Sequence, residues 1–171
     1  MKLFKNQKGN ALSQSKGFTL IELLVVIGIL AVLLAITLIA INPARQFSQA
    51  NNTKRRGDVN AILNAVNQYM ADNKGAAPTG ITTTALTLKK PVGTDGIDIC
   101  GVLVSTYIAA LPTDPKVGVG TGTGAGTAVT DCTQATYNAG YTIVQSATNS
   151  RITVAVPTAN QELGEVISVT R

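Results

Sequence analysis

Histidine and tryptophan are both absent from the 171-residue sequence, and aromatic residues make up only 4% of it. Histidine is the commonest general base and the commonest metal ligand in proteins. Its absence therefore excludes nucleophile–histidine pairs and histidine-based metal centres. The scarcity of aromatic side chains also predicts a hydrophobic core with few large side chains. We expect that this protein is not an enzyme.

Acidic residues are missing from residues 1–17, which carry four lysines, whereas the other 154 residues hold ten basic and nine acidic side chains. The net charge of +5 therefore belongs mainly to the N-terminal segment, which is typical of a targeting sequence. No aromatic residues interleave with the basic cluster at 54–56, so we expect no specific nucleic-acid partner.

Cysteine is scarce, because Cys100 and Cys132 are the only two and they form no Cys-x-x-Cys motif. If the C-terminal part of the chain is exported, these two residues are expected to form a disulfide. Closing a loop of this length would stabilise the fold by roughly 3–4 kcal/mol. Two free buried thiols are the alternative.

One long hydrophobic run is present. From Phe18 to Ile41 the 24 residues contain a single charge, Glu22. A helix of this length is about 36 Å long, enough to cross a bilayer. A secretory signal peptide has a shorter apolar region, typically about 7–15 residues, and no convincing cleavage site follows Ile41. The lysine-rich side is expected to stay in the cytoplasm, which places the C-terminal part outside.

Glu22 argues against a plain single-span anchor. A carboxylate inside an apolar run costs on the order of 2.5–3.5 kcal/mol at mid-bilayer, so it usually has a partner. A cut after Gly17 would give Phe18 a positively charged amine and make Glu22 the fifth residue of the new chain. An acid in the early turns suits the unsatisfied N–H groups of a helix. The N-terminal amine of a neighbouring subunit could also pair with it.

Residues 16–34, KGFTLIELLVVIGILAVLL, resemble the processing site and helix start of bacterial type IV pilins and type II secretion pseudopilins. Weaker resemblance continues through the next helix, through residues 111–115 and into the final strands. The resemblance implies that a membrane peptidase cuts between Gly17 and Phe18 and methylates Phe18. It also implies that Glu22 sets the register between subunits. Many relatives have a helix-bending proline a few residues earlier than Pro43.

The resemblance further implies a membrane protein that assembles with copies of itself. The chain would span the inner membrane once, with its leader in the cytoplasm. It would then enter a helical filament, either an extracellular pilus or a periplasmic fibre. The implied partners are a prepilin peptidase and methyltransferase, an assembly platform and an ATPase.

No cofactor is expected, apart from calcium as a weak candidate. Major pseudopilins of the family that this chain resembles use calcium in the head region, and calcium binds loop carboxylates and carbonyls. The candidate ligands are Asp95, Asp98, Asp114 and Asp131. Their spacing matches no defined loop, and solvated loop acids are the alternative.

Pro43 predicts a kink near Ile41–Asn42, followed by a second helix that ends at Gly75. The apolar residues between 59 and 70 fall on one face of this helix, which should pack on the head. The basic cluster Lys54-Arg55-Arg56 is interpreted either as a solvated helix face or as a contact with an adjacent subunit or lipid head groups.

The rest of the chain predicts a head with an antiparallel sheet. A short element is expected near 85–88, a helix over 101–110, and an exposed mobile loop over the glycine-rich residues 117–130. Strands are predicted at 141–145, 151–156 and 165–170, joined as a meander.

The predicted fold is α+β, with a long N-terminal helix, hydrophobic and then amphipathic, packed on a small antiparallel sheet. We divide the chain into a leader (1–17), a filament-core helix (18–43), an amphipathic helix (44–75) and a head (76–171). The leading hypothesis is a structural subunit of a type IV pilus-like filament. One alternative is a pseudopilin of a type II secretion or DNA-uptake system. Another is a membrane-anchored surface binding module whose ligand site is the 141–171 sheet.

Overall fold

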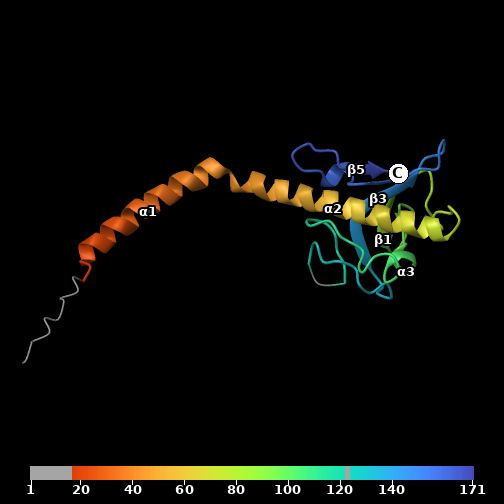
Figure 1. Ribbon diagram of the computed structural model, residues 1–171, viewed down its shortest axis with the longest axis horizontal. Coiled ribbons are helices and arrows are strands. Elements are labelled where there is room, and N and C mark those ends of the chain that lie inside the picture. The colour runs from red at the N-terminus through yellow and green to blue at the C-terminus, as the bar shows by residue number, and fades with distance from the viewer. Residues whose placement is uncertain (1–16, 122–123) are drawn as a thin grey trace, which may run out of the picture. The chain divides into compact units, whose positions relative to one another are not determined.

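The computed structural model describes residues 17–121 and 124–171. The lysine-rich part of the predicted leader, residues 1–16, lies outside these residues. The chain divides into two compact units, one up to Asn42 and one from Pro43 to Arg171. The first unit contains α1 (Leu20–Ile41), and the second contains the other described helices and strands (Figure 1).

The helix α1 has 22 residues and follows from the apolar run. It ends at Asn42, whose left-handed φ of 48° asparagine tolerates better than most residues. Pro43 then occupies the first position of α2 (Pro43–Asp72), where a missing N–H is harmless. The predicted break near Ile41–Asn42 is confirmed.

The helix α2 buries one face along its middle, as the sequence predicts. The fully buried apolar positions are spaced so that they lie on one side of the helix: Val59, Ile62, Leu63 and Val66. The helix ends where Gly75, with a φ of 86°, donates its N–H to the carbonyl of Met70 at 2.7 Å.

The sheet has five strands in the order β2-β1-β3-β4-β5. Their bounds are Leu86–Lys90 (β1), Gly96–Ile97 (β2), Tyr137–Gln145 (β3), Ile152–Ala155 (β4) and Ser168–Thr170 (β5). The predicted antiparallel meander is confirmed in β3, β4 and β5. β1 lies where a short element is expected and pairs antiparallel with β3, whereas β2, which pairs parallel with β1, is not predicted.

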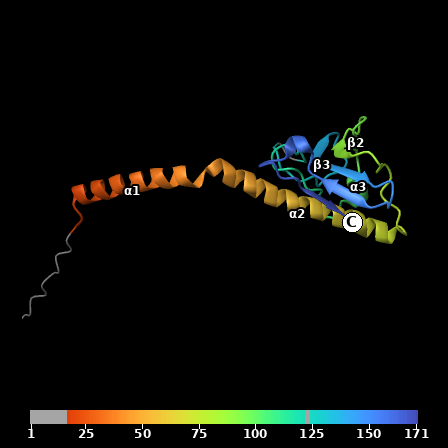
Figure 2. The same ribbon diagram turned by 90° about the horizontal axis from the view of Figure 1, so that it is seen from above.

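The core of the second unit lies between α2 and the sheet (Figures 1 and 2). The inward side chains of the strands include Tyr141, Ile143 and Val154, all fully buried. The short helix α3 (Cys100–Leu103) joins this core. Cys100 is fully buried and bonded to Cys132, with their Cα atoms 5.5 Å apart, so the predicted disulfide is present.

The helix predicted over 101–110 is wrong for most of its length. It ends at Leu103, because Ser105 takes a left-handed φ of 71° and reverses the chain. Val104 then pairs with Ile108 as an isolated bridge. The helical spacing of the apolar residues reflects a tight turn here rather than a continuous helix.

The glycine-rich segment 117–130 is only partly the exposed loop that the sequence predicts. Val129 is fully buried and pairs with Leu111, and Gly118 and Gly120 are also buried. The ends of this segment therefore belong to the core. Residues 122 and 123 lie outside the described residues.

Replacing both cysteines by alanine removes the covalent link between α3 and residue 132. The bonded residues are 32 positions apart, so we expect the free energy of unfolding to fall by about 3–4 kcal/mol. Urea unfolding measures this difference. A Val92→Ala control, at an exposed side chain, should change stability by less than about 0.5 kcal/mol. A double variant as stable as the parent would show that the link constrains nothing.

Candidate functional site

The predicted processing site lies at the start of α1. Gly17 and Phe18 are exposed and precede the first helical residue. Thr19 caps the helix, because its hydroxyl oxygen accepts the N–H of Glu22 at 3.2 Å. In return, Glu22 Oε2 accepts the N–H and the hydroxyl of Thr19, both at 2.8 Å. This capping box fixes where the helix begins, and a cut after Gly17 would leave both of its residues in the same chain.

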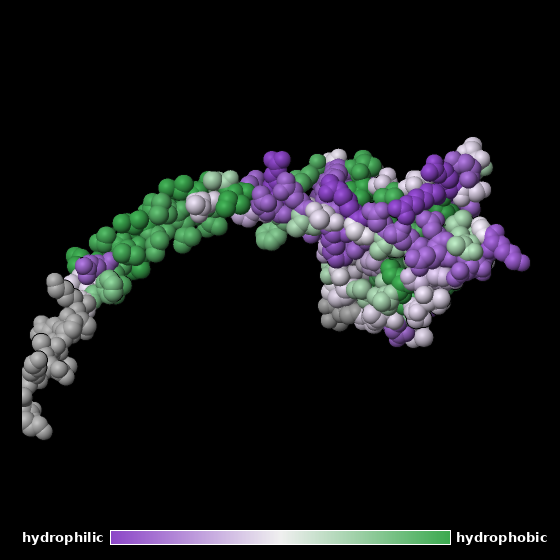
Figure 3. All heavy atoms as spheres, viewed as in Figure 1, coloured by the Kyte–Doolittle hydropathy of each residue, from purple (hydrophilic) through white to green (hydrophobic). Residues whose placement is uncertain are grey.

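The surface of α1 is almost entirely apolar. None of its residues is buried, and its large apolar side chains are exposed by 50% at Val25 to 84% at Ile39. Its length and composition suffice to cross a membrane. The helix surface around Gly28 is formed by the apolar side chains of Leu24, Val25, Ile29, Val32 and Leu33. Figure 3 shows this hydrophobic surface along the helix, which needs a cover of lipid or protein in water.

A second site lies within the second unit, where α2 meets two loops. Arg55 is fully buried, and its Nε and Nη2 donate to Asp114 at 2.7 and 3.2 Å. Its Nη1 donates to Glu162 at 2.8 Å and to Asn52 at 3.0 Å. The guanidinium thus binds the loop of Asp114 through two hydrogen bonds and the loop of Glu162 through one. Lysine could not reproduce this geometry.

Asp114 is also held by its own loop. Its Oδ1 accepts the backbone N–H groups of Lys116 and Val117 at 2.9 and 3.1 Å. In β3, Gly140 has a φ of 78°, and a side chain there would approach the Cβ of Asp114 to 2.7 Å. Only glycine therefore allows β3 and this loop to pack so closely.

Charge pairing sets the protonation of this cluster. Burial alone would raise the pKa of Asp114, but hydrogen bonds from Arg55 and from two backbone N–H groups lower it below its ordinary value. Burial also opposes the lowering of the Glu162 pKa, which Asn51, Arg55 and Lys116 bring about. Burial would lower the pKa of Arg55, and its two carboxylates raise it. All three groups are therefore charged at neutral pH.

Lys54 extends the polar contacts of α2 towards the sheet. Its Nζ donates to Asp58 at 2.6 Å and to the carbonyl of Thr113 at 2.7 Å. Tyr141 in β3 donates to the same Asp58 oxygen at 2.6 Å. Burial, together with this bond to Asp58, raises the pKa of the Tyr141 phenol. The first half of α2 is thus attached to the head by polar contacts rather than by apolar packing.

Two comparisons with known proteins found matches, one to the N-terminal segment and one to a longer part of the chain. Residues 12–38 match the model of the prokaryotic N-terminal methylation motif. Over 110 residues the chain is 36% identical to the type II secretion system core protein G of Pseudomonas aeruginosa. That alignment covers 60% of this chain and 68% of the relative. The chain belongs to the pilin and pseudopilin family. No solved structure matches it at a significant level.

The matched motif of this pilin-family chain contains Gly17, Phe18 and Glu22. The structure places all three at or just before the first turn of α1. Cleavage after Gly17, methylation of Phe18 and the register role of Glu22 stay predictions.

The basic cluster at 54–56 fits the interpretation of a solvated helix face at Lys54 and Arg56, which are exposed, but not at Arg55. Arg55 is neither solvated nor accessible to lipid or a neighbouring subunit, because it is fully buried between Asp114 and Glu162. Arg56 is more exposed but pairs with Glu165. The expectation of solvated loop acids is likewise wrong for Asp114, because a buried guanidinium needs a carboxylate beside it.

The helical spacing of residues in α2 is the sequence feature that could have predicted the burial of Arg55. The buried stripe that contains Val59 continues towards the N-terminus at Arg55 and Asn52, at steps of four and three residues. A basic residue on the buried side of a helix requires a buried acid. The sequence does not indicate which acids of the head meet it.

The four candidate calcium ligands do not form one site. Among the described residues there is no group of three or more acidic or cysteine side chains that could hold a metal ion. Each aspartate has another partner: Asp114 binds Arg55, Asp95 binds Lys89, Asp98 accepts from Tyr137, and Asp131 accepts from Thr133. Calcium binding by any of these residues stays a prediction.

Asp114→Asn tests the buried ion pair. The amide keeps the shape of the side chain but removes the charge that faces a buried guanidinium, so we expect the free energy of unfolding to fall by about 3–5 kcal/mol. Arg56→Met removes the more exposed pair with Glu165 and should lower stability by less than about 1 kcal/mol. Urea unfolding at neutral pH gives both values. Equal losses would contradict the distinction between the two pairs.

Stability should also depend on pH through Asp114. Because folding lowers its pKa, the unfolded chain binds a proton first as the pH falls. The stabilisation that Asp114 contributes is complete above about pH 5 and is lost as the pH falls through the lowered pKa, at up to about 1.4 kcal/mol per pH unit. Asp114→Asn lacks this contribution and should show a shallower decline in urea titrations at acidic pH. If the free energy of unfolding fell equally steeply with pH in the parent and in Asp114→Asn, Asp114 would not contribute to the pH dependence of stability.

Proposed function

We propose that this protein is a structural subunit of a membrane-derived filament and not an enzyme. The uncovered apolar surface of α1 is the observation that carries the proposal. Exposing such a surface to water is unfavourable by roughly 25 cal/mol per Å². Lipid covers it before assembly, and the α1 helices of other copies cover it in a helical filament. Membership of the pilin and pseudopilin family supports this proposal.

In this proposal the chain is made as a membrane-spanning precursor. The lysine-rich leader stays in the cytoplasm and α1 crosses the inner membrane once. A prepilin peptidase cuts between Gly17 and Phe18, and the new amine of Phe18 is methylated. The matched N-terminal motif supports this step. An assembly platform and an ATPase then transfer the subunit from the bilayer to the filament.

Glu22 sets the axial register of the filament in this account. The cap uses Oε2 of its carboxylate, so we assign Oε1 to the Phe18 amine of a neighbouring copy. A carboxylate without a partner is costly in an apolar helix bundle. The stagger that pairs the two charges is therefore favoured over others.

A short periplasmic fibre of a type II secretion system is the favoured form of this filament. The 36% identity to core protein G favours it. A type IV pilus is the second candidate, because the N-terminal motif suits both machines. Electron microscopy of cells that express the chain with its own machinery separates the two. Long surface filaments that contain this chain would favour the pilus and contradict the periplasmic fibre.

Glu22→Gln removes the charge and keeps the shape of the side chain. We expect the cut after Gly17 to proceed while the yield of sheared fibres falls at least about tenfold, because the charge pair that selects the stagger is lost. Thr37→Ala is a matched control in α1, since the Thr37 hydroxyl donates to the Leu34 carbonyl of its own helix at 2.9 Å. Immunoblots of sheared fibres and membranes measure both yields. A normal fibre yield from Glu22→Gln would contradict the register role.

A further inference from the structure

The loop before β5 is held against α2 by two glutamates. We call residues 161–166 the strap. The Glu162 carboxylate accepts hydrogen bonds at 2.8 to 3.4 Å from four side chains: Ser48, Asn51, Arg55 and Lys116. Glu162 is therefore fixed from both α2 and the loop that contains Asp114.

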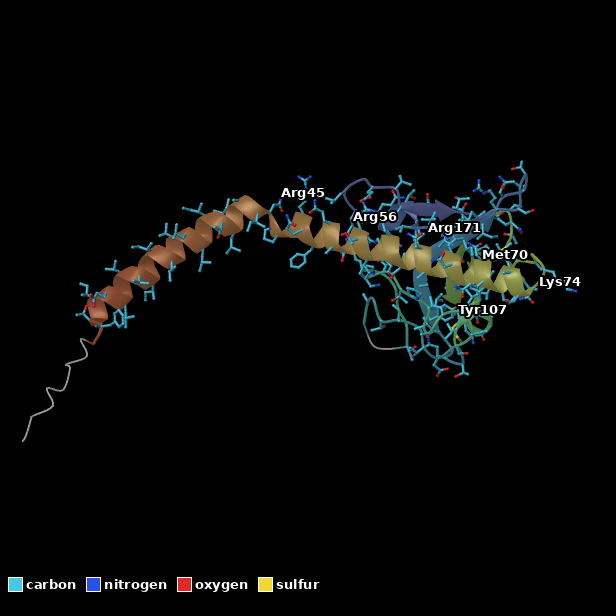
Figure 4. All side chains as sticks on the ribbon, in the orientation of Figure 1. Arg45, Arg56, Met70, Lys74, Tyr107 and Arg171 are labelled. Atoms are coloured by element: carbon cyan, nitrogen blue, oxygen red, sulfur yellow. A yellow bond between two sulfur atoms is a disulfide. The ribbon has the colours of Figure 1, made fainter. Side chains whose placement is uncertain are left out.

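Glu165 attaches the other end of the strap. Its carboxylate accepts from Asn52 at 3.0 Å and pairs with Arg56, which is labelled in Figure 4. Asn52 also donates to the backbone carbonyl of Glu162 at 3.0 Å. Both acids of the strap are therefore attached to α2.

The strap directs its apolar side chains outward. Leu163 is 54% exposed and Val166 is 73% exposed. Leu163 has a left-handed φ of 58°, which is sterically strained for a residue with a side chain. Leu163 also lines a recess of about 410 Å³ together with polar side chains of α2. The strap thus exposes Leu163 and Val166 although the backbone conformation of Leu163 is strained.

This exposure is concentrated at one end of α2. Among the described residues from Pro43 onward, Phe47 is the other large apolar side chain that is more than half exposed, at 72%. It directly precedes Ser48, which bonds to Glu162.

We propose that the strap, through Leu163 and Val166, is a docking surface for a neighbouring copy of this chain in the filament. The proposal rests on the proposed function. The strap is attached to α2 between residues 48 and 56, only 7 to 15 residues beyond the end of α1 at Ile41. When α1 helices bundle, chain connectivity keeps this end of the second unit close to other copies.

The strap offers a partner an apolar contact without an unpaired charge. It carries two glutamates, Glu162 and Glu165. Both are neutralised by side chains of α2, and the outward pair is uncharged. An uncharged apolar pair suits the apolar surface that each further copy brings to the filament.

Site-specific photo-crosslinking tests the occupant of this surface. A benzophenone amino acid replaces Leu163 or Val166 in the full-length chain, expressed with its assembly machinery, and the same probe at exposed Val92 is the control. Irradiated fibres are sheared, and the products are separated and mapped by mass spectrometry. We expect covalent dimers of this chain from positions 163 and 166 and markedly fewer from position 92.

The outcomes separate the strap from the proposed function. Fibres of the cut chain that give only lipid adducts, only adducts to other proteins, or as many dimers from position 92, would overturn the docking surface and leave the filament intact. If the chain is not cut after Gly17 and no fibres form, the filament and the docking surface both fail.

Val166→Asp provides a second test that does not depend on a probe. It places a charge in the proposed contact, and we expect the fibre yield to fall at least about tenfold. The thermal unfolding midpoint of the full chain in detergent should stay unchanged, because the side chain is exposed. Val92→Asp should keep both the midpoint and the fibre yield. Unchanged fibre yield for Val166→Asp would overturn the proposal.

Discussion

The uncovered apolar surface of α1 is the constraint on which the rest of this molecule depends. No residue of this helix is buried, although its composition is that of a protein core. Water therefore disfavours the isolated subunit, whereas lipid and other α1 helices both accommodate it. Glu22 is the single charge in the run, and the cap with Thr19 places it in the first turn. The same helix can thus be stored in a membrane and aligned with its neighbours.

In the second unit, polar contacts hold the first half of α2 against the head. Apolar packing holds this helix only from about Val59 onward. Before that point, Arg55 binds Asp114 and Glu162 and so fixes two loops that are distant in the sequence. Burying these charges offsets much of their attraction, whereas removing one partner leaves an uncompensated buried charge. One consequence is that the strap has a fixed position with its apolar residues outward.

Local patterns in the sequence predict much of the fold. The apolar run, Pro43 and the stripe from Val59 each give the correct helix or break, and alternating residues give the meander of β3 to β5. The three residues of the predicted processing and register site lie together at the start of α1. These features depend on neighbours in the chain, so periodicity and turn chemistry suffice to predict them.

Long-range pairing is what the sequence does not determine. Arg55 is 59 residues from Asp114 and 107 from Glu162, and no local pattern links them. Solvated and buried charges have the same composition, so the sequence does not show that Arg55 is buried while Lys54 and Arg56 are exposed. The short α3 is misjudged for a related reason, because its apolar spacing fits a helix but the turn at Ser105 brings the same residues into the core.

The intact mass of the protein, purified from membranes or from sheared fibres, tests the central claim most directly. The account predicts a chain that begins at Phe18 and carries one additional methyl group, because only this cut gives Glu22 a neighbouring amine to pair with. A chain that still begins at Met1, or one cut beyond Ile41, would contradict it. The first result would leave a simple membrane anchor, and the second a secreted protein without α1.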